Sequence, residues 1–181
     1  MMGPFSGMVL LIDLDACVRC RSCQVTCREE QALAHEATSP WCGVATVGPR
    51  TVDGRMHMDF VPVVCFHCDE PLCVRVCPEG AIAKDDIGFV AVDYKICTGC
   101  RLCVYACPYG RMFVNGSGTA GHCDLCRGRV KEGLEPACVQ HCIGGSLQFV
   151  SKEEVLKRTS EEHRLLLGKI CYISSTWRLP A

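Results

Sequence analysis

Short apolar runs that end at polar turns dominate the hydrophobic pattern of the chain. Residues 9–12 form a continuous apolar run that stops at Asp13, and residues 89–92 form a second that stops at Asp93. Apolar runs of this length, bounded by turn signals, are typical of buried β-strands. The pattern therefore predicts a short strand at both places.

Two β-hairpins follow from the same pattern. Residues 81–93, AIAKDDIGFVAVD, are predicted to form two short strands joined by a turn at residues 85–88. Residues 50–64, RTVDGRMHMDFVPVV, are predicted to form a longer hairpin with its turn at Asp53 and Gly54, since Asp-Gly is a strong two-residue turn signal.

The C-terminal segment is expected to be a helix followed by an apolar tail. Residues 151–169 begin with Ser151 and Glu154 in the spacing of a capping box and reach Gly168 as a helix stop. Residues 170–181, ICYISSTWRLPA, are strand-like and apolar, which suggests docking against a partner subunit. Packing on the chain's own core is the alternative.

Cysteine changes this picture, because 18 of the 181 residues are cysteine. The N-terminus has no basic segment ahead of its apolar run and no arginine pair, so dense thiols indicate metal in a reducing compartment rather than disulfides.

No apolar run approaches the roughly 20 residues of a membrane span. We expect a cytoplasmic protein without direct membrane insertion; export with a signal-bearing partner, or a peripheral position on a membrane subunit, is the alternative. The formal net charge of −1 predicts no nucleic-acid partner.

Sixteen of the cysteines fall into four groups of four. The spacing is x2, x2, x3 in the first and third groups, x2, x4, x3 in the second, and x2, x11, x3 in the fourth. In chain order the groups are Cys17, Cys20, Cys23 and Cys27; Cys65, Cys68, Cys73 and Cys77; Cys97, Cys100, Cys103 and Cys107; and Cys123, Cys126, Cys138 and Cys142. Cys42 and Cys171 stand outside the groups and are expected to be ordinary buried thiols.

The spacing of the third group, which Pro108 follows, is that of bacterial ferredoxins. In such a run three cysteines bind one [4Fe–4S] cluster and the fourth binds its neighbour. Zinc instead takes four ligands, usually from two separated C-x2-C knuckles. The pattern predicts iron–sulfur clusters, with a zinc-stabilised scaffold as the less favoured alternative. His67, His122 and His141 border cysteines, but complete cysteine sets make histidine ligands unnecessary.

The chain also repeats itself. Residues 8–27 align with residues 88–107, and EPLCVRVCPEGAI at 70–82 aligns with EPACVQHCIGGSL at 135–147. The fourth group is therefore the second group with an insertion after Cys126. A repeated motif of this kind predicts that one structural unit occurs twice.

The repeat predicts how the groups combine. The second and third groups form one ferredoxin unit, and the first and fourth form the other, in which residues 8–13 pair with residues 146–150 as the two halves of 81–93 pair with each other. Each fourth cysteine then binds the cluster of the partner group. The predicted sets are Cys17, Cys20, Cys23 and Cys142; Cys123, Cys126, Cys138 and Cys27; Cys65, Cys68, Cys73 and Cys107; and Cys97, Cys100, Cys103 and Cys77.

With these motifs, the sequence resembles the four-cluster electron-transfer (beta) subunits of the DMSO reductase superfamily. The likeness is carried by CFHCDEPLCVRVCPEGAI, GFVAVDYKICTGCRLCVYACPYG and HCDLCRGRVKEGLEPACVQHC. Proline follows Cys77 and Cys107 but not Cys27 and Cys142. The absence of proline does not affect ligation, because proline only fixes φ at that position. The resemblance implies four [4Fe–4S] clusters that relay single electrons, in anaerobic metabolism, between a molybdenum- or tungsten-pterin catalytic subunit and a further redox subunit or carrier. Similar subunits accompany formate hydrogenlyase and tungsten aldehyde oxidoreductases.

The expected fold is α+β, with two pseudo-symmetric bacterial-type ferredoxin units, inserted hairpin and loops, and the C-terminal helix and tail. The expected divisions are residues 1–30 and 115–150 for the first unit, 31–60 for an inserted cover segment, 61–114 for the second unit, and 151–181 for the helix and tail. A polar loop at 111–122 crosses between the units. No nucleophile–base pair or phosphate-binding loop is found, so the chain is expected to have no catalytic residues. A free-standing polyferredoxin is the alternative function.

Overall fold

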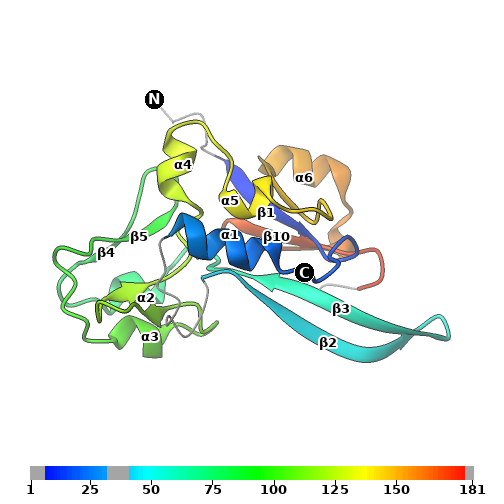
Figure 1. Ribbon diagram of the computed structural model, residues 1–181. Coiled ribbons are helices and arrows are strands. Elements are labelled where there is room, and N and C mark those ends of the chain that lie inside the picture. The colour runs from blue at the N-terminus through cyan, green and yellow to red at the C-terminus, as the bar shows by residue number, and fades with distance from the viewer. Residues whose placement is uncertain (1–6, 32–40, 178–181) are drawn as a thin grey trace.

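The structure is a computed structural model that describes residues 7–31 and 41–177 (Figure 1). Predictions that fall on residues 1–6, 32–40 and 178–181 lie outside the described residues; they concern the start of the first unit, the start of the cover segment and the end of the tail. The architecture is α+β, as predicted. Its helices are α1 (Ser22–Glu30), α2 (Leu72–Arg75), α3 (Leu102–Ala106), α4 (Arg127–Lys131), α5 (Ala137–Gln140) and α6 (Lys152–Arg158).

A mixed four-stranded sheet, in the order β8-β1-β10-β9, carries the main core. β1 pairs antiparallel with β8, which confirms the predicted pairing near residues 8–13 and 146–150, and parallel with β10. Because β1 has a strand on each edge and side chains packed on both faces, residues 9–12 are all buried, as their continuous apolar run requires. The strands are β1 (Met8–Asp13), β8 (Leu147–Ser151), β9 (Arg164–Leu167) and β10 (Ile170–Ile173).

The two faces of this sheet contact different elements. Leu10 and Ile12 lie in the main core, together with cysteines of α1 and α5. Val9 and Leu11 point the opposite way, because side chains alternate along a strand, and pack with Val155 of α6. The sheet therefore has α6 on one face and the cysteine-bearing helices on the other.

A second, smaller core lies to one side of the sheet, around α2, α3, β4 (Ile82–Lys84) and β5 (Val90–Val92) (Figure 1). β4 and β5 pair antiparallel, which confirms the predicted hairpin at 81–93. Apart from Cys73 and Cys103, the buried residues of this core are Ile82, Val90, Met112 and Ala120. So few apolar side chains supply little stabilisation, and we therefore expect this core to depend on whatever its cysteines bind.

A long hairpin, β2 (Gly43–Val52) and β3 (Arg55–Val63), extends from the body of the molecule (Figure 1). Asp53 and Gly54 form its turn with φ of 49° and 74°, which confirms the predicted position. Positive φ at both central residues is what a tight hairpin turn of this kind requires. β2 begins at Gly43, well before the predicted start at residue 50.

Arg50 connects this hairpin to the C-terminal segment. Its Nη2 donates to Asp59 Oδ1 at 3.1 Å and to Thr176 Oγ1 at 2.9 Å, and its guanidinium lies 5.1 Å from the centre of the Trp177 ring. The hydrogen bond from Arg50 is the main reason that the pKa of Asp59 lies below its usual value. The contribution of Asp59 to stability is therefore present above pH ~4 and lost as the pH falls through its lowered pKa.

Replacing Arg50 by alanine is expected to loosen the hairpin without unfolding the core. A partly exposed ion pair is worth at most about 1 kcal/mol, which corresponds to roughly fivefold faster exchange of hairpin amides. Arg55→Ala, at the exposed start of β3, is the matched control. Equal exchange rates in the two variants would show that Arg50 does not hold the hairpin.

The predicted helix at residues 151–169 is correct only at its start. Ser151 Oγ accepts from the Glu154 N–H at 3.2 Å, as a capping box predicts, but α6 ends at Arg158. A 3₁₀ turn at Glu161–His163 and strand β9 follow, because pairing with β10 outweighs the helix propensity of the leucines. Gly168 lies in the β9–β10 turn, not at a helix end.

Two further segments differ from the prediction. The loop at 111–122 contains a short hairpin whose strands, β6 (Phe113–Val114) and β7 (Ala120–Gly121), have two residues each. It forms because the Gly/Ser centre of the loop makes a turn. The tail segment at β10 is an inner strand of the sheet rather than a docking surface: Ile170 and Tyr172 are buried, and Tyr172 Oη donates to the Pro62 carbonyl at 3.0 Å. At β10 the tail therefore packs on the chain's own core, which is the second of the two alternatives.

Candidate metal centres

All four cysteine groups share one backbone feature. The residue two positions after the first cysteine has a left-handed conformation in each group, with φ of 57° at Arg19, 49° at His67, 71° at Gly99 and 55° at Leu125. Three of these four are not glycine, so the conformation is held against its usual cost. The N–H groups of Arg19, His67 and Leu125 bond back to the thiol of the first cysteine. These three loops thus curl around the sulfur atom of their first cysteine.

The third cysteine of each group begins a helix. Cys23, Cys73, Cys103 and Cys138 are each the second residue of α1, α2, α3 and α5 respectively. In each case the N–H of the following residue bonds to the cysteine sulfur. Unpaired N–H groups at a helix start favour a negative charge, which suits a thiolate that binds metal.

The structure brings twelve of the cysteines together as three sets of four. Each set lines one hollow, and the hollows enclose about 330, 370 and 390 Å³ of empty space, counting the part that is open to solvent. In that order the linings contain Cys17, Cys20, Cys23 and Cys142; Cys65, Cys68, Cys73 and Cys107; and Cys77, Cys97, Cys100 and Cys103. In every set three cysteines come from one group and one from another.

The other four grouped cysteines, Cys27, Cys123, Cys126 and Cys138, are all buried, and all except Cys126 belong to the main core. Burial, and then the charge of Cys126, raise the pKa of Cys138. Burial, and then the charge of Cys27, raise the pKa of Cys123. Burial raises the pKa of Cys27 to about 12, and the charge of Cys126 adds to the effect. These mutual effects indicate that the four thiols are near neighbours.

Raised pKa values are the rule among the buried cysteines. Burial, and then the charges of neighbouring thiolates, raise the pKa of Cys65 to about 12 and that of Cys73 to about 11. A thiol in such a place stays protonated unless a cation replaces its proton, so metal binding here releases protons. Four sulfur donors around a hollow, with backbone N–H groups directed at them, fit a [4Fe–4S] cluster.

Three side chains that the sequence did not single out as site residues lie against the cysteine sets. The Cys42 thiol, only 1% exposed, is hydrogen-bonded to Cys23, and the Cys42 N–H bonds to the Cys27 sulfur. Gln31 Nε2 lies 3.9 Å from Cys126 Sγ. Lys84 Nζ donates to the Cys68 carbonyl at 2.9 Å. None of the three has a motif spacing that reveals its position; the tertiary fold places them.

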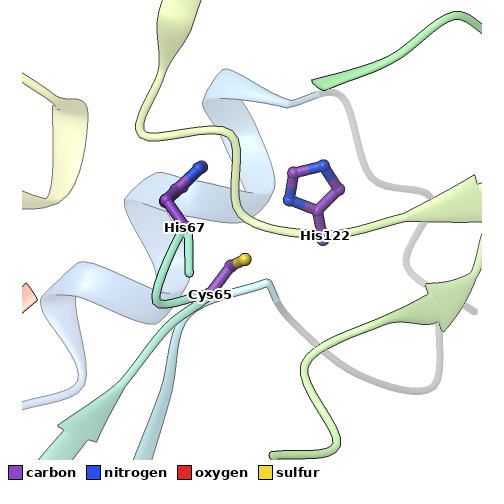
Figure 2. A group of neighbouring side chains, drawn as sticks. All are labelled: Cys65, His67 and His122. Atoms are coloured by element: carbon purple, nitrogen blue, oxygen red, sulfur yellow. The ribbon is translucent and has the colours of Figure 1, made fainter. Parts of the chain in front are cut away.

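His67 and His122 are fully buried beside Cys65, and a ring nitrogen of each lies within 4.8 Å of the Cys65 sulfur (Figure 2). Burial lowers the pKa of both rings, to about 4 for His122. Cys65 already lines the hollow with three other cysteines, so the histidines are neighbours of a complete donor set. His141 is exposed, and its Nδ1 lies 3.0 Å from the Ala137 carbonyl oxygen.

The β9–β10 turn supports the loop that carries Cys65 and Cys68. The Lys169 N–H donates to the Phe66 carbonyl at 2.8 Å. Gly168 has φ of 56°, and a Cβ atom at this position would clash with the carbonyl oxygens of Phe66 and His67. The close approach of the turn to the cysteine loop therefore requires glycine.

Gly168→Ala is expected to destabilise the protein by about 2 kcal/mol or more and to release iron from the set that contains Cys65. The left-handed conformation alone costs about 1–2 kcal/mol, and the clash adds to it. Gly133→Ala is the control, because Gly133 has φ of 83° but open space around its Cα. Thermal unfolding and iron content measure the difference. Equal loss in both variants would mean that the contact with the loop is unimportant.

No helix in the described part of the chain is both long and apolar enough to cross a membrane.

Residues 56–152 match a family model described as a 4Fe-4S dicluster domain. The donor sets and this match together define an iron–sulfur protein.

Three relatives illustrate the similarity. The chain is 37% identical over 153 residues to YnfG of Escherichia coli K12, a probable anaerobic dimethyl sulfoxide reductase component, in a match that covers 81% of this chain and 75% of the relative. It is 37% identical over 155 residues to a component of the anaerobic dimethyl sulfoxide reductase of the same strain, with the same coverage. It is 41% identical over 148 residues to a tetrathionate reductase component of Salmonella typhimurium, in a match that covers 80% of this chain and 58% of the relative. The chain belongs to the family of dimethyl sulfoxide reductase iron–sulfur subunits, and it is an electron-transfer subunit that carries [4Fe–4S] clusters.

Proposed function

We propose that the chain holds four [4Fe–4S] clusters, each bound by three cysteines of one group and the fourth cysteine of another. The observation that carries this is the mixed lining of the three hollows. The ligand sets are Cys17, Cys20, Cys23 and Cys142 (cluster 1); Cys123, Cys126, Cys138 and Cys27 (cluster 2); Cys65, Cys68, Cys73 and Cys107 (cluster 3); and Cys97, Cys100, Cys103 and Cys77 (cluster 4). Each cluster accepts and releases one electron.

The four clusters belong to two pseudo-symmetric units. Clusters 1 and 2 lie in the unit built on the main core, and clusters 3 and 4 in the unit built on the smaller core. In both units an antiparallel strand pair, β1–β8 or β4–β5, accompanies two cysteine groups. The matching left-handed conformations of Arg21 and Arg101, with φ of 61° and 67°, support the repeat.

The subunit has no catalysis of its own and relays single electrons between a molybdenum- or tungsten-pterin catalytic subunit and another redox partner. Support comes from the surface next to the clusters. Cys20 and Cys100, which belong to clusters 1 and 4, are exposed. Ile143, 81% exposed, follows Cys142 of cluster 1, and Tyr105, 82% exposed, is two residues from Cys103 of cluster 4. Exposed apolar side chains beside accessible clusters suit transient or stable docking of redox partners.

Purification of the tagged chain from its native host without oxygen tests this role. We expect a larger subunit that contains molybdenum or tungsten to co-purify, and substrate added to that complex to reoxidise the dithionite-reduced clusters. A chain that elutes alone but carries its full iron would instead be a free polyferredoxin. Free cysteines must stay reduced until the clusters are inserted, which favours assembly in the cytoplasm, and we propose that the subunit stays there; fractionation of the host tests that placement.

A further inference from the structure

His67 and Leu125 occupy equivalent places in the chain's two related cysteine groups. Each stands between the first two cysteines of its group, in a left-handed conformation with φ of 49° and 55°. Both are buried. The two loops thus share a left-handed residue at this place, but one presents an imidazole there and the other an alkyl group. Clusters 3 and 2 of one protein can therefore be compared with and without an imidazole at this place.

Hydrogen bonds fix the tautomer of His67. The Val90 N–H donates to His67 Nδ1 at 2.8 Å, so Nδ1 bears no proton and the proton of the neutral ring is on Nε2. Nε2 is buried and has no hydrogen-bond partner among the described residues. A buried donor without an acceptor costs about 1–3 kcal/mol, so an acceptor is expected when the protein is loaded with its clusters.

The protein atoms around the His67 ring do not supply that acceptor. The Cys123 carbonyl faces the ring and lies 2.6 Å from His122 Nδ1, but it forms no hydrogen bond with His67 Nε2 within the normal limits of distance and angle. The rings of His67 and His122 have their centres 5.9 Å apart and meet edge to face. A ring nitrogen of each lies within 4.8 Å of Cys65 Sγ, on the side where the three side chains converge (Figure 2). The Cys65 sulfur lies near the two rings, so sulfur of cluster 3 is the candidate acceptor for Nε2–H once the cluster is bound.

We propose that His67 Nε2–H donates a hydrogen bond to a sulfur atom of cluster 3, either Cys65 Sγ or an adjoining sulfide, and thereby raises the reduction potential of that cluster. The inference rests on the proposed ligand sets. Reduction adds negative charge to the cluster, and a donor to its sulfur stabilises the reduced state more than the oxidised state. Cluster 2, with Leu125 at the equivalent place, lacks this donor. His67 is thus a positioning residue that separates the potentials of two otherwise similar clusters at the boundary between the units.

Redox titration of His67→Leu followed by electron paramagnetic resonance tests the proposal. Leucine copies the fourth group, and we expect the one-electron reduction of cluster 3 to become about tenfold less favourable, a shift of about 59 mV to lower potential. His67→Gln, which keeps an N–H donor, should lie between this variant and the wild type. His141→Leu is the control, because His141 borders a ligand of cluster 1 but is exposed and bonded to backbone; it should not shift any potential. Cys68→Ser identifies the signal of cluster 3.

An unchanged potential in His67→Leu with all iron retained would overturn the proposal, and so would a shift confined to cluster 2. If His67→Leu does not assemble, the proposal can be tested on the wild-type protein labelled with ¹⁵N-histidine. The magnetic resonance signal of reduced cluster 3 must then show coupling to one histidine nitrogen and to its exchangeable proton. Absence of that coupling would equally contradict it. If the wild-type protein binds far fewer than about 16 iron atoms per chain, the proposed ligand sets are wrong, and the result does not bear on His67.

Discussion

Replacing Cys20 and Cys142 together is expected to remove one cluster, whereas replacing Cys20 and Cys27 together is expected to remove two. Cys20 and Cys142 come from groups that are far apart in sequence, yet both line the same hollow. Cys20 and Cys27 are neighbours in one group, but Cys27 belongs to the proposed ligand set of Cys123, Cys126 and Cys138, whose charges act on one another. Because a cubane needs four ligands, losing a second ligand of the same cluster costs no further cluster.

Iron content and electron paramagnetic resonance of the dithionite-reduced alanine variants measure this effect. The Cys20/Cys142 double variant should retain about 12 iron atoms and the Cys20/Cys27 double variant about 8, out of about 16 in the wild type. The single variants Cys20→Ala and Cys142→Ala should alter the same signal. The opposite ranking of the two double variants would mean that each group binds its own cluster, and the crossed ligand sets would be wrong.

Removal of iron with a chelator is expected to unfold the smaller core and to leave the four-stranded sheet folded. The smaller core contains four buried side chains besides Cys73 and Cys103, whereas the main core includes strands β1, β8 and β10 and many apolar residues. Metal binding supplies folding free energy where the core is too small to supply it. The two units should therefore respond differently to the same treatment.

Hydrogen exchange on the iron-free protein separates the two responses. Amides of β4 and β5 should lose nearly all of their protection, while those of β1 and β10 keep most of theirs. Equal loss in both regions would show that the sheet also depends on its clusters. Equal retention would show that the clusters contribute little to folding, and the dependence of the smaller core on metal would be wrong.

The cysteine pattern is the part of the structure that sequence predicts best. The spacing of each group fixes a local loop and the start of a helix, and the Glu-Pro-x-Cys repeat at Glu70 and Glu135 relates the second group to the fourth across the long insertion. The strand pairs β1–β8 and β4–β5 follow from the same repeat. Local rules suffice for the cysteine loops, because three cysteines of each group lie close in sequence, whereas the β1–β8 pair is foreseen only through the repeat.

The C-terminal region is predicted less well because its structure is set by distant contacts. Leu165–Leu167 have good helix propensity, but β10 inserts between β1 and β9 and recruits them into the sheet. Likewise, no local signal places Cys42 against Cys23, and a left-handed conformation is foreseeable at Gly99 but not at Arg19 or Leu125. Tertiary packing overrides local preference at each of these positions.

Iron, acid-labile sulfide and zinc measured in one sample purified without oxygen test the central claim most directly. Four clusters predict about 16 iron and 16 sulfide per chain and no stoichiometric zinc. About two to four zinc ions per chain with little iron and no sulfide would contradict it, because a tetrahedral zinc site also takes four thiolates but carries no electron.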